Sequence, residues 1–240
     1  MVIEGAGHVV MISGANRGIG KSIANALYSA GYDLSLGARD VTSLEKAFPE
    51  FDEKRVLHHS FEATNRDTHV SWIEATANKF GRLDGLVNNA GIMRSVSMSD
   101  EVYDESALDL MWTVNVKAPL SLTKLALPHL RQSGSGRVVN VASLAGKAVY
   151  GSAVGYSMTK FAAVALSHAT RHAGWDDGVR CTAICPGYVA TDMTSAVESM
   201  ELKDMISADD LAQLVVTIMQ LSNTASVAEL VVNCRPDIVA

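Results

Sequence analysis

Short apolar runs alternate with longer stretches of helical periodicity along the whole chain. The β-type runs are His8–Ser13, Asp33–Ala38, Val56–Ser60, Leu83–Asn88, Arg137–Ala142, Val179–Cys185 and Glu229–Asn233. The helical stretches are Gly18–Ala30, a short helix after Ala38, Asp67–Lys79, Tyr103–Gln132, Tyr156–Ala173 and a helix near Ala208–Gln220. Strands separated by helices need crossover connections, which are right-handed and give parallel pairing. The pattern predicts an α/β fold, a doubly wound seven-stranded parallel sheet with helices on both faces.

Nothing between these elements resembles a linker, so we expect residues 1–240 to form a single domain. The Gly- and Ser-rich segment at residues 133–136 is too short for a linker and lies where a helix must end before the next strand. The least regular segment runs from Pro186 to about Asp204 and is longer than an ordinary loop between a strand and a helix. It is a candidate lid or substrate loop.

Composition narrows the choice of partners and compartment. Apolar residues make up 48% of the chain and charged residues 19%, which is typical of a compact globular protein. The formal charge is −6 and no Lys or Arg cluster is present, so we expect no nucleic-acid partner. No apolar stretch approaches the ~20 residues that span a bilayer, and Met1–Val10 lacks the basic region and long apolar core of a signal peptide. We therefore expect a cytoplasmic protein with no membrane partner.

The cysteine and histidine positions predict no metal site. Three cysteines, an odd number, argue against a disulfide framework and fit a reducing compartment. Cys181 and Cys185 are four residues apart in a predicted strand, roughly 13 Å, which is too far for one metal ion, so we expect buried small hydrophobic side chains. No spacing places two histidines on one helical face beside a carboxylate, and we expect His129 and His168 to be surface or partly buried residues.

A glycine-rich turn directly follows the first predicted strand. It reads Ser13-Gly-Ala-Asn-Arg-Gly-Ile-Gly20 and leads into a predicted helix. Gly14 lets the chain turn off the strand, Gly18 lets the backbone approach a pyrophosphate, and Gly20 lets the helix pack against the sheet. The N–H groups and dipole of the helix then point at the anion. This context favours dinucleotide binding over a chance turn.

The end of the second predicted strand indicates which dinucleotide binds. Ala38 stands about 20 residues beyond the glycine turn, where NAD-specific sites usually carry an Asp or Glu for the ribose hydroxyls. Arg39 follows it, and together with Arg17 it offers guanidinium groups that match a 2′-phosphate. We therefore expect a preference for NADP(H). The alternative is that both arginines are solvated surface residues.

One pair of side chains indicates proton transfer. Tyr156 and Lys160 are four residues apart and so lie on one face of a predicted helix. A phenol with the ordinary pKa of about 10 is a poor acid or base at neutral pH, and a neighbouring cation favours the phenolate. Ser143 ends the preceding strand, and its hydroxyl can hydrogen-bond a substrate oxygen as charge develops there. This spacing alone usually marks an ordinary helix face, but the serine and the glycine turn favour a catalytic centre.

The ordered motifs resemble the short-chain dehydrogenase/reductase family over essentially the whole chain. The matching motifs are the glycine turn, Asn88-Asn-Ala-Gly91, Asn115 in a long helix, the trio Ser143, Tyr156 and Lys160, and Pro186-Gly187 with Thr191 downstream. The resemblance implies a single-domain Rossmann-like fold. Its dinucleotide-binding half would span about residues 1–135, and its catalytic and substrate half about residues 136–240.

The resemblance also implies an activity. It implies an NADP(H)-dependent oxidoreductase that transfers a hydride between the nicotinamide and a secondary alcohol or ketone, or a 3-hydroxy or 3-oxo acid. Tyr156 would donate or accept the proton, Ser143 would hold the carbonyl oxygen and Lys160 would bond the nicotinamide ribose. Asn115 would anchor a water in a proton relay. The residues expected at the cofactor are Ser13, Gly14, Asn16, Arg17, Gly18, Ile19, Gly20, Arg39, Glu62, Asn89, Ala90, Gly91, Tyr156, Lys160, Pro186, Gly187, Val189 and Thr191.

Two segments depart from the family pattern. Many members carry an Asp near the adenine at the end of the third strand, where this chain has Glu62, which either replaces it or is a solvated loop carboxylate. The C-terminal residues from Glu229 to Pro236 lack the glycine pair that ends many members. They look more like the subgroup that acts on 3-hydroxy acids and serine-like substrates.

Residues that flank the predicted centre are expected to set substrate specificity. They are Met93, Arg94, Ala145, Tyr150, Tyr188 and Met193. Most are apolar or aromatic, which favours a mainly hydrophobic carbonyl compound. Arg94 would recruit a carboxylate if its side chain points inward, and otherwise it is a surface arginine.

The two longest predicted helices bear on assembly. Residues 103–132 and 156–173 carry apolar side chains over more than one face, as expected if each helix packs on the sheet and on another subunit. We expect a homodimer or homotetramer, as the family forms. Two other functions stay open: a non-catalytic NADP(H)-binding sensor or regulatory protein, and an epimerase or dehydratase on the same fold.

Overall fold

The computed structural model describes residues 2–102, 104–149, 152–195, 197 and 199–236. Within these residues the chain forms one sheet in which every neighbouring pair of strands is parallel. The strand order is β3-β2-β1-β4-β5-β6-β7, which confirms the predicted seven-stranded parallel sheet. The strands are β1 (Val9–Ser13), β2 (Asp33–Ala38), β3 (Val56–Ser60), β4 (Gly85–Asn88), β5 (Arg137–Val141), β6 (Arg180–Pro186) and β7 (Glu229–Val232).

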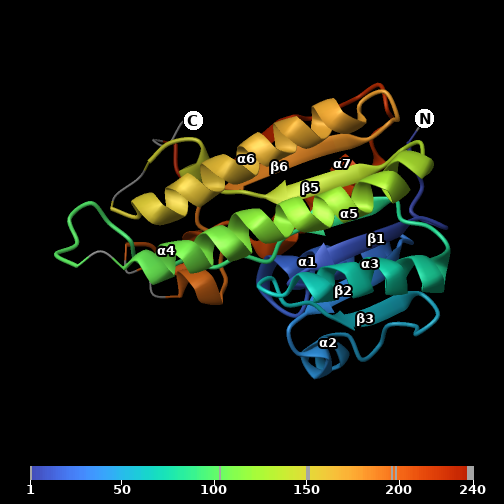
Figure 1. The fold of residues 1–240 in the computed structure, drawn as a ribbon, viewed down its shortest axis with the longest axis horizontal. Helices are drawn as coiled ribbons and strands as arrows, with labels where there is room; N and C mark the ends of the chain where they lie inside the picture. Colours follow the sequence, from blue (N-terminus) through green and yellow to red (C-terminus); the bar gives the residue numbers. More distant parts are fainter. Residues whose placement is uncertain (1, 103, 150–151, 196, 198, 237–240) are drawn as a thin grey trace.

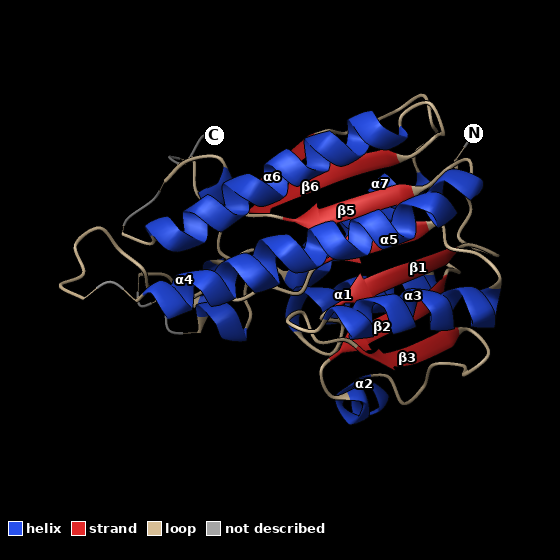
Figure 2. Ribbon diagram, viewed as in Figure 1, coloured by secondary structure: helices blue, strands red, loops and turns tan. Residues whose placement is uncertain are grey.

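Helices cover both faces of this sheet (Figure 1). One face carries α3 (Arg66–Phe80), α5 (Ala118–Gln132) and α6 (Val154–Gly174), which lie in front of the strands in Figure 2. The opposite face carries α1 (Gly18–Ser29) and α7 (Ala208–Gln220), which pack against each other. The short α2 (Val41–Ala47) lies beside β2 and β3. This is the doubly wound arrangement that the alternation of runs predicted.

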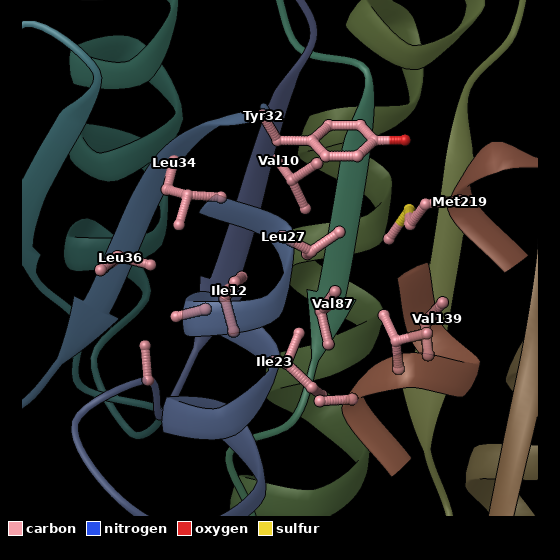
Figure 3. Close-up of a cluster of buried hydrophobic side chains, with 14 of the residues drawn as sticks. Val10, Ile12, Ile23, Leu27, Tyr32, Leu34, Leu36, Val87, Val139 and Met219 are labelled. Atoms are coloured by element: carbon pink, nitrogen blue, oxygen red, sulfur yellow. The ribbon is translucent and has the colours of Figure 1, made fainter. Parts of the chain in front are cut away.

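Successive side chains of the central strands enter two different apolar layers. Val10 and Ile12 of β1 pack with Ile23 and Leu27 of α1 (Figure 3). Met11, between them, packs in the layer formed with α3 and α5. Because both faces of the sheet are buried at its centre, strand β1 is a continuous apolar run from Val9 to Ile12 rather than an alternating one. The same reason makes Cys181 and Cys185 of β6 buried, as predicted, and burial raises the pKa of Cys181 to about 12 and that of Cys185 to about 11.

The segment expected to be one helix, Tyr103–Gln132, has three parts. It consists of α4 (Glu105–Trp112), a π-helical turn at Thr113–Lys117, and α5. The Asp104 side chain caps α4 by accepting a hydrogen bond from the Ala107 N–H at 3.0 Å, which fixes its start. In the π turn the N–H of Ala118 donates to the carbonyl of Thr113, five residues earlier. Tyr103 lies outside the described residues, and the rest of the predicted stretch is helical without a break from Glu105 to Gln132. The π turn within it was not predicted, because apolar periodicity does not reveal one extra residue in a turn.

The remaining predicted boundaries lie within two residues of those in the structure. The start of α6 at Val154 places Tyr156 inside its first turn. The segment from Pro186 to Asp204 is more regular than expected. It contains 3₁₀ turns at Asp192–Thr194 and Leu202–Asp204, and an isolated parallel bridge joins Val189 to Ile206.

The chain crosses from β3 at one edge of the sheet back to β4, which lies next to β1. In sheets of this kind, ligands bind at the carboxyl ends of the strands where the order reverses. The fold therefore places the turns after β1 and β4 beside each other at the expected binding crevice. Among the described residues, no helix combines the length and the apolar character needed to cross a membrane.

Candidate active site

A cavity of about 620 Å³ opens at the carboxyl ends of the central strands. Its walls include the segments that follow each of the seven strands, together with the beginning of α6. This volume falls within the range of roughly 300–1,000 Å³ that is typical of ligand sites. The predicted cofactor and catalytic residues that line it are Gly14, Asn16, Arg17, Gly18, Ile19, Arg39, Glu62, Asn89, Ala90, Gly91, Ser143, Tyr156, Lys160, Pro186, Gly187, Val189 and Thr191.

The glycine turn between β1 and α1 presents free backbone donors to this cavity. Gly14 has a φ of +65° and Gly18 a φ of +52°, conformations that glycine adopts without strain. Arg17 is the N-cap of α1, and no side chain caps the helix there. The first turn of α1 contains no acidic residue. An uncapped helix N-terminus of this kind attracts an anion such as a phosphate.

Two predicted cofactor residues support the turn from behind and do not line the cavity. A Cβ on Gly20 would lie 2.3 Å from the Gly14 carbonyl oxygen and 2.5 Å from Asn89 Nδ2, so the absence of a side chain lets α1 pack closely on the turns that follow β1 and β4. Asn89 Nδ2 donates to the carbonyls of Ser13 and Gly14 at 2.9 and 3.0 Å. Ser13 Oγ in turn accepts hydrogen bonds from the N–H groups of Asn89 and Ala90 at 3.0 and 3.1 Å. Ser13 Oγ is therefore used within the protein, and a contact of Ser13 with the cofactor stays a prediction.

Arg17 is engaged by the loop that follows β6. Its Nη1 donates to Asp192 Oδ2 at 2.8 Å, and both side chains are more than two-thirds exposed. Next to this pair, a Cβ on Gly18 would lie 3.4 Å from Thr191 Cγ2. The contact of Arg17 with a phosphate stays a prediction. Arg17 joins the two sides of the cavity.

Polar side chains gather where β2 ends. Arg39 is exposed and lines the cavity. Asp40 accepts hydrogen bonds from the hydroxyl and N–H of Thr42 at 2.7 and 2.9 Å, and these hold the pKa of Asp40 below its ordinary value. Asn16 Nδ2 donates to Ser43 Oγ at 3.1 Å. Asp40 and Ser43 also line the cavity but were not predicted, although their place directly after the second strand was the available signal.

Glu62, after β3, lines the cavity, but its carboxylate is turned toward its own loop. Its Oε1 accepts hydrogen bonds from the hydroxyl and N–H of Thr64 at 3.1 and 3.3 Å. Phe61 and Ala63 complete this part of the wall. Glu62 therefore lies at the site, and one of its carboxylate oxygens already accepts hydrogen bonds from within its own loop.

Ser143, Tyr156 and Lys160 converge on the cavity from two neighbouring elements. Ser143 is the N-cap of the 3₁₀ turn Leu144–Gly146, and its Oγ accepts a hydrogen bond from the Ala145 N–H at 3.1 Å. Lys160 Nζ donates to the Val141 carbonyl at 2.9 Å and lies 5.5 Å from the centroid of the Tyr156 ring. Lys160 is only 7% exposed, and no ion pair to it forms within the described part of the chain. A buried cation therefore faces a phenol that borders the cavity.

Asn115 lies in the π turn, behind the cavity wall. Its Oδ1 accepts a hydrogen bond from the Ile92 N–H at 2.9 Å, and its Nδ2 donates to the Ile92 carbonyl at 2.8 Å and to Thr159 Oγ1 at 3.1 Å. Thr159 Oγ1 donates to the Tyr156 carbonyl at 2.7 Å. The side chain predicted to be catalytic therefore does not border the cavity. It holds the segment after β4 against the first turns of α6.

The predicted substrate residues divide into three groups. Arg94 is exposed, does not line the cavity and donates from Nη1 to the Met93 carbonyl at 3.2 Å, so the surface alternative applies. Tyr150 lies outside the described residues. Those that line the cavity are Met93, Ala145, Tyr188 and Met193.

Comparison with known proteins decides the family. A family model described as short chain dehydrogenase matches residues 8–202. The chain belongs to the short-chain dehydrogenase family. The resemblance carried by the ordered motifs is thereby confirmed.

Relatives of this short-chain dehydrogenase include proteins of different lengths. It is 44% identical over 230 residues to an agropine synthesis reductase of Rhizobium rhizogenes, a match that covers 95% of this chain and 53% of that protein. The chain thus spans about half the length of that relative. It is 34% identical over 200 residues to an uncharacterized oxidoreductase of Staphylococcus saprophyticus, covering 82% of this chain and 80% of that protein.

A solved relative has the same fold. The alcohol dehydrogenase from the archaeon Thermococcus sibiricus, complexed with 5-hydroxy-NADP, is 29% identical and superposes with a TM-score of 0.84. The match covers 94% of this chain and 95% of that chain. This short-chain dehydrogenase therefore shares its architecture over nearly its full length.

One more residue of the short-chain dehydrogenase site was not anticipated. Asn233 follows β7 directly and lines the cavity, and a Cβ on Gly187 would lie 2.9 Å from its Oδ1. The sequence showed this segment only as a departure from the usual glycine pair. The signal that could have identified Asn233 was a polar residue at the carboxyl end of a strand, since the site lies at that edge of the sheet. Among the described residues, no group of three or more His, Cys, Asp and Glu side chains is arranged to hold a metal ion.

Proposed function

We propose that this short-chain dehydrogenase is an NADP(H)-dependent oxidoreductase that transfers a hydride between the nicotinamide and a secondary alcohol or ketone. The observation that carries the proposal is that one cavity is lined both by the turn at the uncapped N-terminus of α1 and by Ser143, Tyr156 and Lys160. A protein that only sensed the dinucleotide would need the helix N-terminus, but it would not need a phenol facing a buried ammonium group.

The residues present fit a dinucleotide. The backbone at Gly18 borders the cavity next to free helix N–H groups, which suits a pyrophosphate. A side chain at position 18 would both contact Thr191 and require a strained backbone, since φ there is +52°. The site therefore keeps space where a phosphate must approach the main chain closely.

Each catalytic role follows from the donors and acceptors that remain available. NADP(H), when bound, supplies or accepts the hydride. Ser143 Oγ already accepts from Ala145, so its proton is free to be donated to a carbonyl oxygen. Lys160 Nζ uses one of its three donors on Val141 and retains two, for Tyr156 and for the nicotinamide ribose. Tyr156 Oη donates the proton in reduction and takes it back in oxidation.

The preference for NADP(H) rests on Arg39. It is the exposed cation at the end of β2, where a 2′-phosphate on the adenosine ribose would lie. A charge-assisted hydrogen bond contributes about 1.5–3 kcal/mol, or roughly ten- to hundredfold in affinity. We expect Arg39→Ala to raise the KM for NADPH by that factor and to leave the KM for NADH nearly unchanged. Steady-state kinetics with both cofactors measure this.

The control for that measurement is Arg131→Ala, which removes an arginine whose ion pair with Asp177 lies on another element. It is expected to leave both constants unchanged. A higher kcat/KM for NADH than for NADPH in the parent protein would contradict the preference.

The substrate we propose is a mainly hydrophobic carbonyl compound. Beyond the proposed catalytic groups, the cavity wall includes the apolar side chains of Met93, Leu144, Ala145 and Met193, together with the polar Tyr188 and Asn233. Arg94 is turned away, so a 3-oxo or 3-hydroxy acid would find no guanidinium group from that residue. The name of the Rhizobium rhizogenes relative, a reductase, supports the reductive direction.

The experiment that tests the function is NADPH oxidation with a panel of ketones and aldehydes. Tyr156→Phe keeps the ring and removes the hydroxyl, so kcat is expected to fall by about 10²- to 10⁴-fold while NADPH still binds. Tyr28→Phe is the control, because that ring stacks on Phe51 far from the cavity. Tight NADPH binding without turnover on the panel would favour a sensor. Product formation without net NADPH consumption would favour an epimerase or dehydratase.

We also propose that the protein assembles as a homodimer or homotetramer in the cytoplasm. Apolar side chains on the outer faces of α5 and α6 are exposed, among them Leu120, Met158 and Phe161 at 43–45%. Together with Trp112 and Val149, residues of α6 form an apolar groove on this side of the molecule. A surface of this character suits packing against a second copy. Size-exclusion chromatography with light scattering tests it, and a monomer at all concentrations would contradict it.

A further inference from the structure

Three ionisable side chains meet at the end of the turn that carries Ser143. Glu229, the first residue of β7, accepts a hydrogen bond from Lys147 Nζ at 2.5 Å on one carboxylate oxygen and from His168 Nε2 at 2.6 Å on the other. The side chains of Lys147 and Glu229 are 26% and 23% exposed, and that of His168 is 40% exposed. None of the three lines the cavity, so they have no direct contact with a bound molecule there.

Glu229 joins the two elements that supply the proposed catalytic groups. Lys147 directly follows the 3₁₀ turn whose N-cap is Ser143. His168 lies on α6 eight residues beyond Lys160, about two helical turns nearer the C-terminal end of the helix. We propose that Glu229 is a positioning residue that fixes the Ser143 turn relative to α6 and so sets the placement of Ser143 against Tyr156.

A first attachment between the turn and the helix already exists at Lys160. A Cβ on Gly146 would lie 2.6 Å from the Lys160 carbonyl oxygen, so the two backbones touch there. The contact through His168 lies eight residues further along α6, about 12 Å at 1.5 Å per residue, so it adds a charged link well away from this packing contact.

The local chemistry keeps the bridge charged. Hydrogen bonds from Lys147 first, and from His168 second, hold the pKa of Glu229 below its ordinary value, and Glu229 raises the pKa of Lys147. Cys185 lies close to the pair, and burial first and the Glu229 carboxylate second raise its pKa to about 11, so it stays neutral. Glu229 also belongs to a four-residue strand at the edge of the described sheet, which pairs only with β6. The bridge ties this edge to the helix layer.

The inference rests on the proposed oxidoreductase function, since it concerns the alignment of that function's catalytic groups. Glu229→Gln keeps the side-chain volume and removes the charge. We expect kcat for ketone reduction to fall about tenfold, because misplacement of reacting groups lowers the rate of the chemical step. The KM and dissociation constant for NADPH are expected to stay unchanged, because the cofactor residues after β1 and β2 keep their contacts.

Three further variants and a control separate positioning from general destabilisation. Glu229→Asp restores a shorter carboxylate and is expected to recover part of kcat. Lys147→Met removes one arm and is expected to lower kcat similarly, while the double variant Glu229→Gln/Lys147→Met is no worse than either single variant, because both break the same link. Asp177→Asn, which removes the exposed ion pair with Arg131, is the matched control and is expected to leave kcat unchanged.

Two outcomes overturn the inference. The first is an unchanged kcat in folded Glu229→Gln. The second is a set of crystal structures in which Ser143 and Tyr156 superpose in the parent and the variant, a readout that needs no turnover. Should Glu229→Gln fail to fold, Lys147→Met and His168→Gln replace it, since each removes only one arm. If the parent protein turns over no carbonyl compound, the proposed function is refuted. If the parent is active and Glu229→Gln has the same kcat, only the positioning role of Glu229 is refuted.

Discussion

At the scale of single residues, the absence of a side chain at position 20 shapes the dinucleotide end of the cavity. A Cβ at this position would lie only 2.3 Å from the Gly14 carbonyl oxygen and 2.5 Å from Asn89 Nδ2. Neither atom moves easily, because one belongs to the backbone and the other donates to two carbonyls. The close approach brings the start of α1 against the turn, so that its N–H groups face the cavity.

Gly20→Ala is therefore expected to lower the free energy of unfolding by about 2–4 kcal/mol and to weaken NADPH binding strongly, since the turn must shift to admit the methyl group. Urea unfolding and a fluorescence titration with NADPH measure the two effects. Gly81→Ala is the matched control, because Gly81 has a φ of +72° but nothing within 4 Å of its Cβ position. Its cost is about 1–2 kcal/mol of backbone strain, with no change in NADPH binding. Equal effects on binding in both variants would refute this account.

At the scale of elements, the π turn between α4 and α5 is bonded both to the segment after β4 and to α6. Asn115 makes three hydrogen bonds from this turn, two to the backbone of Ile92 and one to Thr159, and it is only 4% exposed. π turns occur frequently at functional sites because the extra residue redirects side chains. Here it aims an amide at Ile92, which lines the cavity.

Asn115→Ala leaves the N–H and carbonyl of Ile92 without their partners, and we expect it to lower the free energy of unfolding by about 2–4 kcal/mol. Amide exchange at Ile92 is expected to accelerate more than the loss of global stability explains. Hydrogen exchange followed by NMR or mass spectrometry measures this. Thr113→Ala removes a hydroxyl that bonds only the Asp109 carbonyl in the same turn region, and it is expected to leave Ile92 protected. Unchanged exchange at Ile92 in Asn115→Ala would contradict the positioning role.

The helices and strands were predictable from the sequence, because local apolar patterns determine them. The contacts between residues far apart in the sequence were not predictable. Apolar runs gave the strands to within two residues, and the spacing of Tyr156 and Lys160 placed both on one face of α6. The pairing of Arg17 with Asp192 joins residues 175 apart, and no periodicity encodes it. The same holds for the link from Lys147 through Glu229 to His168. Side chains such as Ser13 matched a motif, but the fold uses them to hold the turn rather than to face the cavity.

At the scale of the whole molecule, the end of the sheet opposite the site depends on a buried carboxylate. Asp84, directly before β4, is 4% exposed and accepts hydrogen bonds from the Val9 N–H at 2.9 Å and from Ser133 Oγ at 2.6 Å. Arg82 donates to both of its oxygens at 2.7 Å. Asp84 thereby joins β1, β4 and the residue that follows α5. Burial alone would raise the pKa of Asp84, but the hydrogen bonds from Arg82, Ser133 and Val9 outweigh it and lower the pKa.

Since the pKa of Asp84 is lower in the folded state than the ordinary value of about 3.9, its charge stabilises the fold above that value, and this contribution is lost as the pH falls through the folded-state pKa. Asp84→Asn places an N–H₂ group against donors, so it is expected to lower the free energy of unfolding at pH 7 by about 3–5 kcal/mol. The difference from the parent protein is expected to shrink below about pH 4. Urea unfolding followed by tryptophan fluorescence between pH 7 and pH 3 measures it, with Asp177→Asn as an exposed control expected to differ by at most about 1 kcal/mol. A difference that stays constant down to pH 3 would show that the shape of the Asp84 side chain, and not its charge, holds this end of the sheet together.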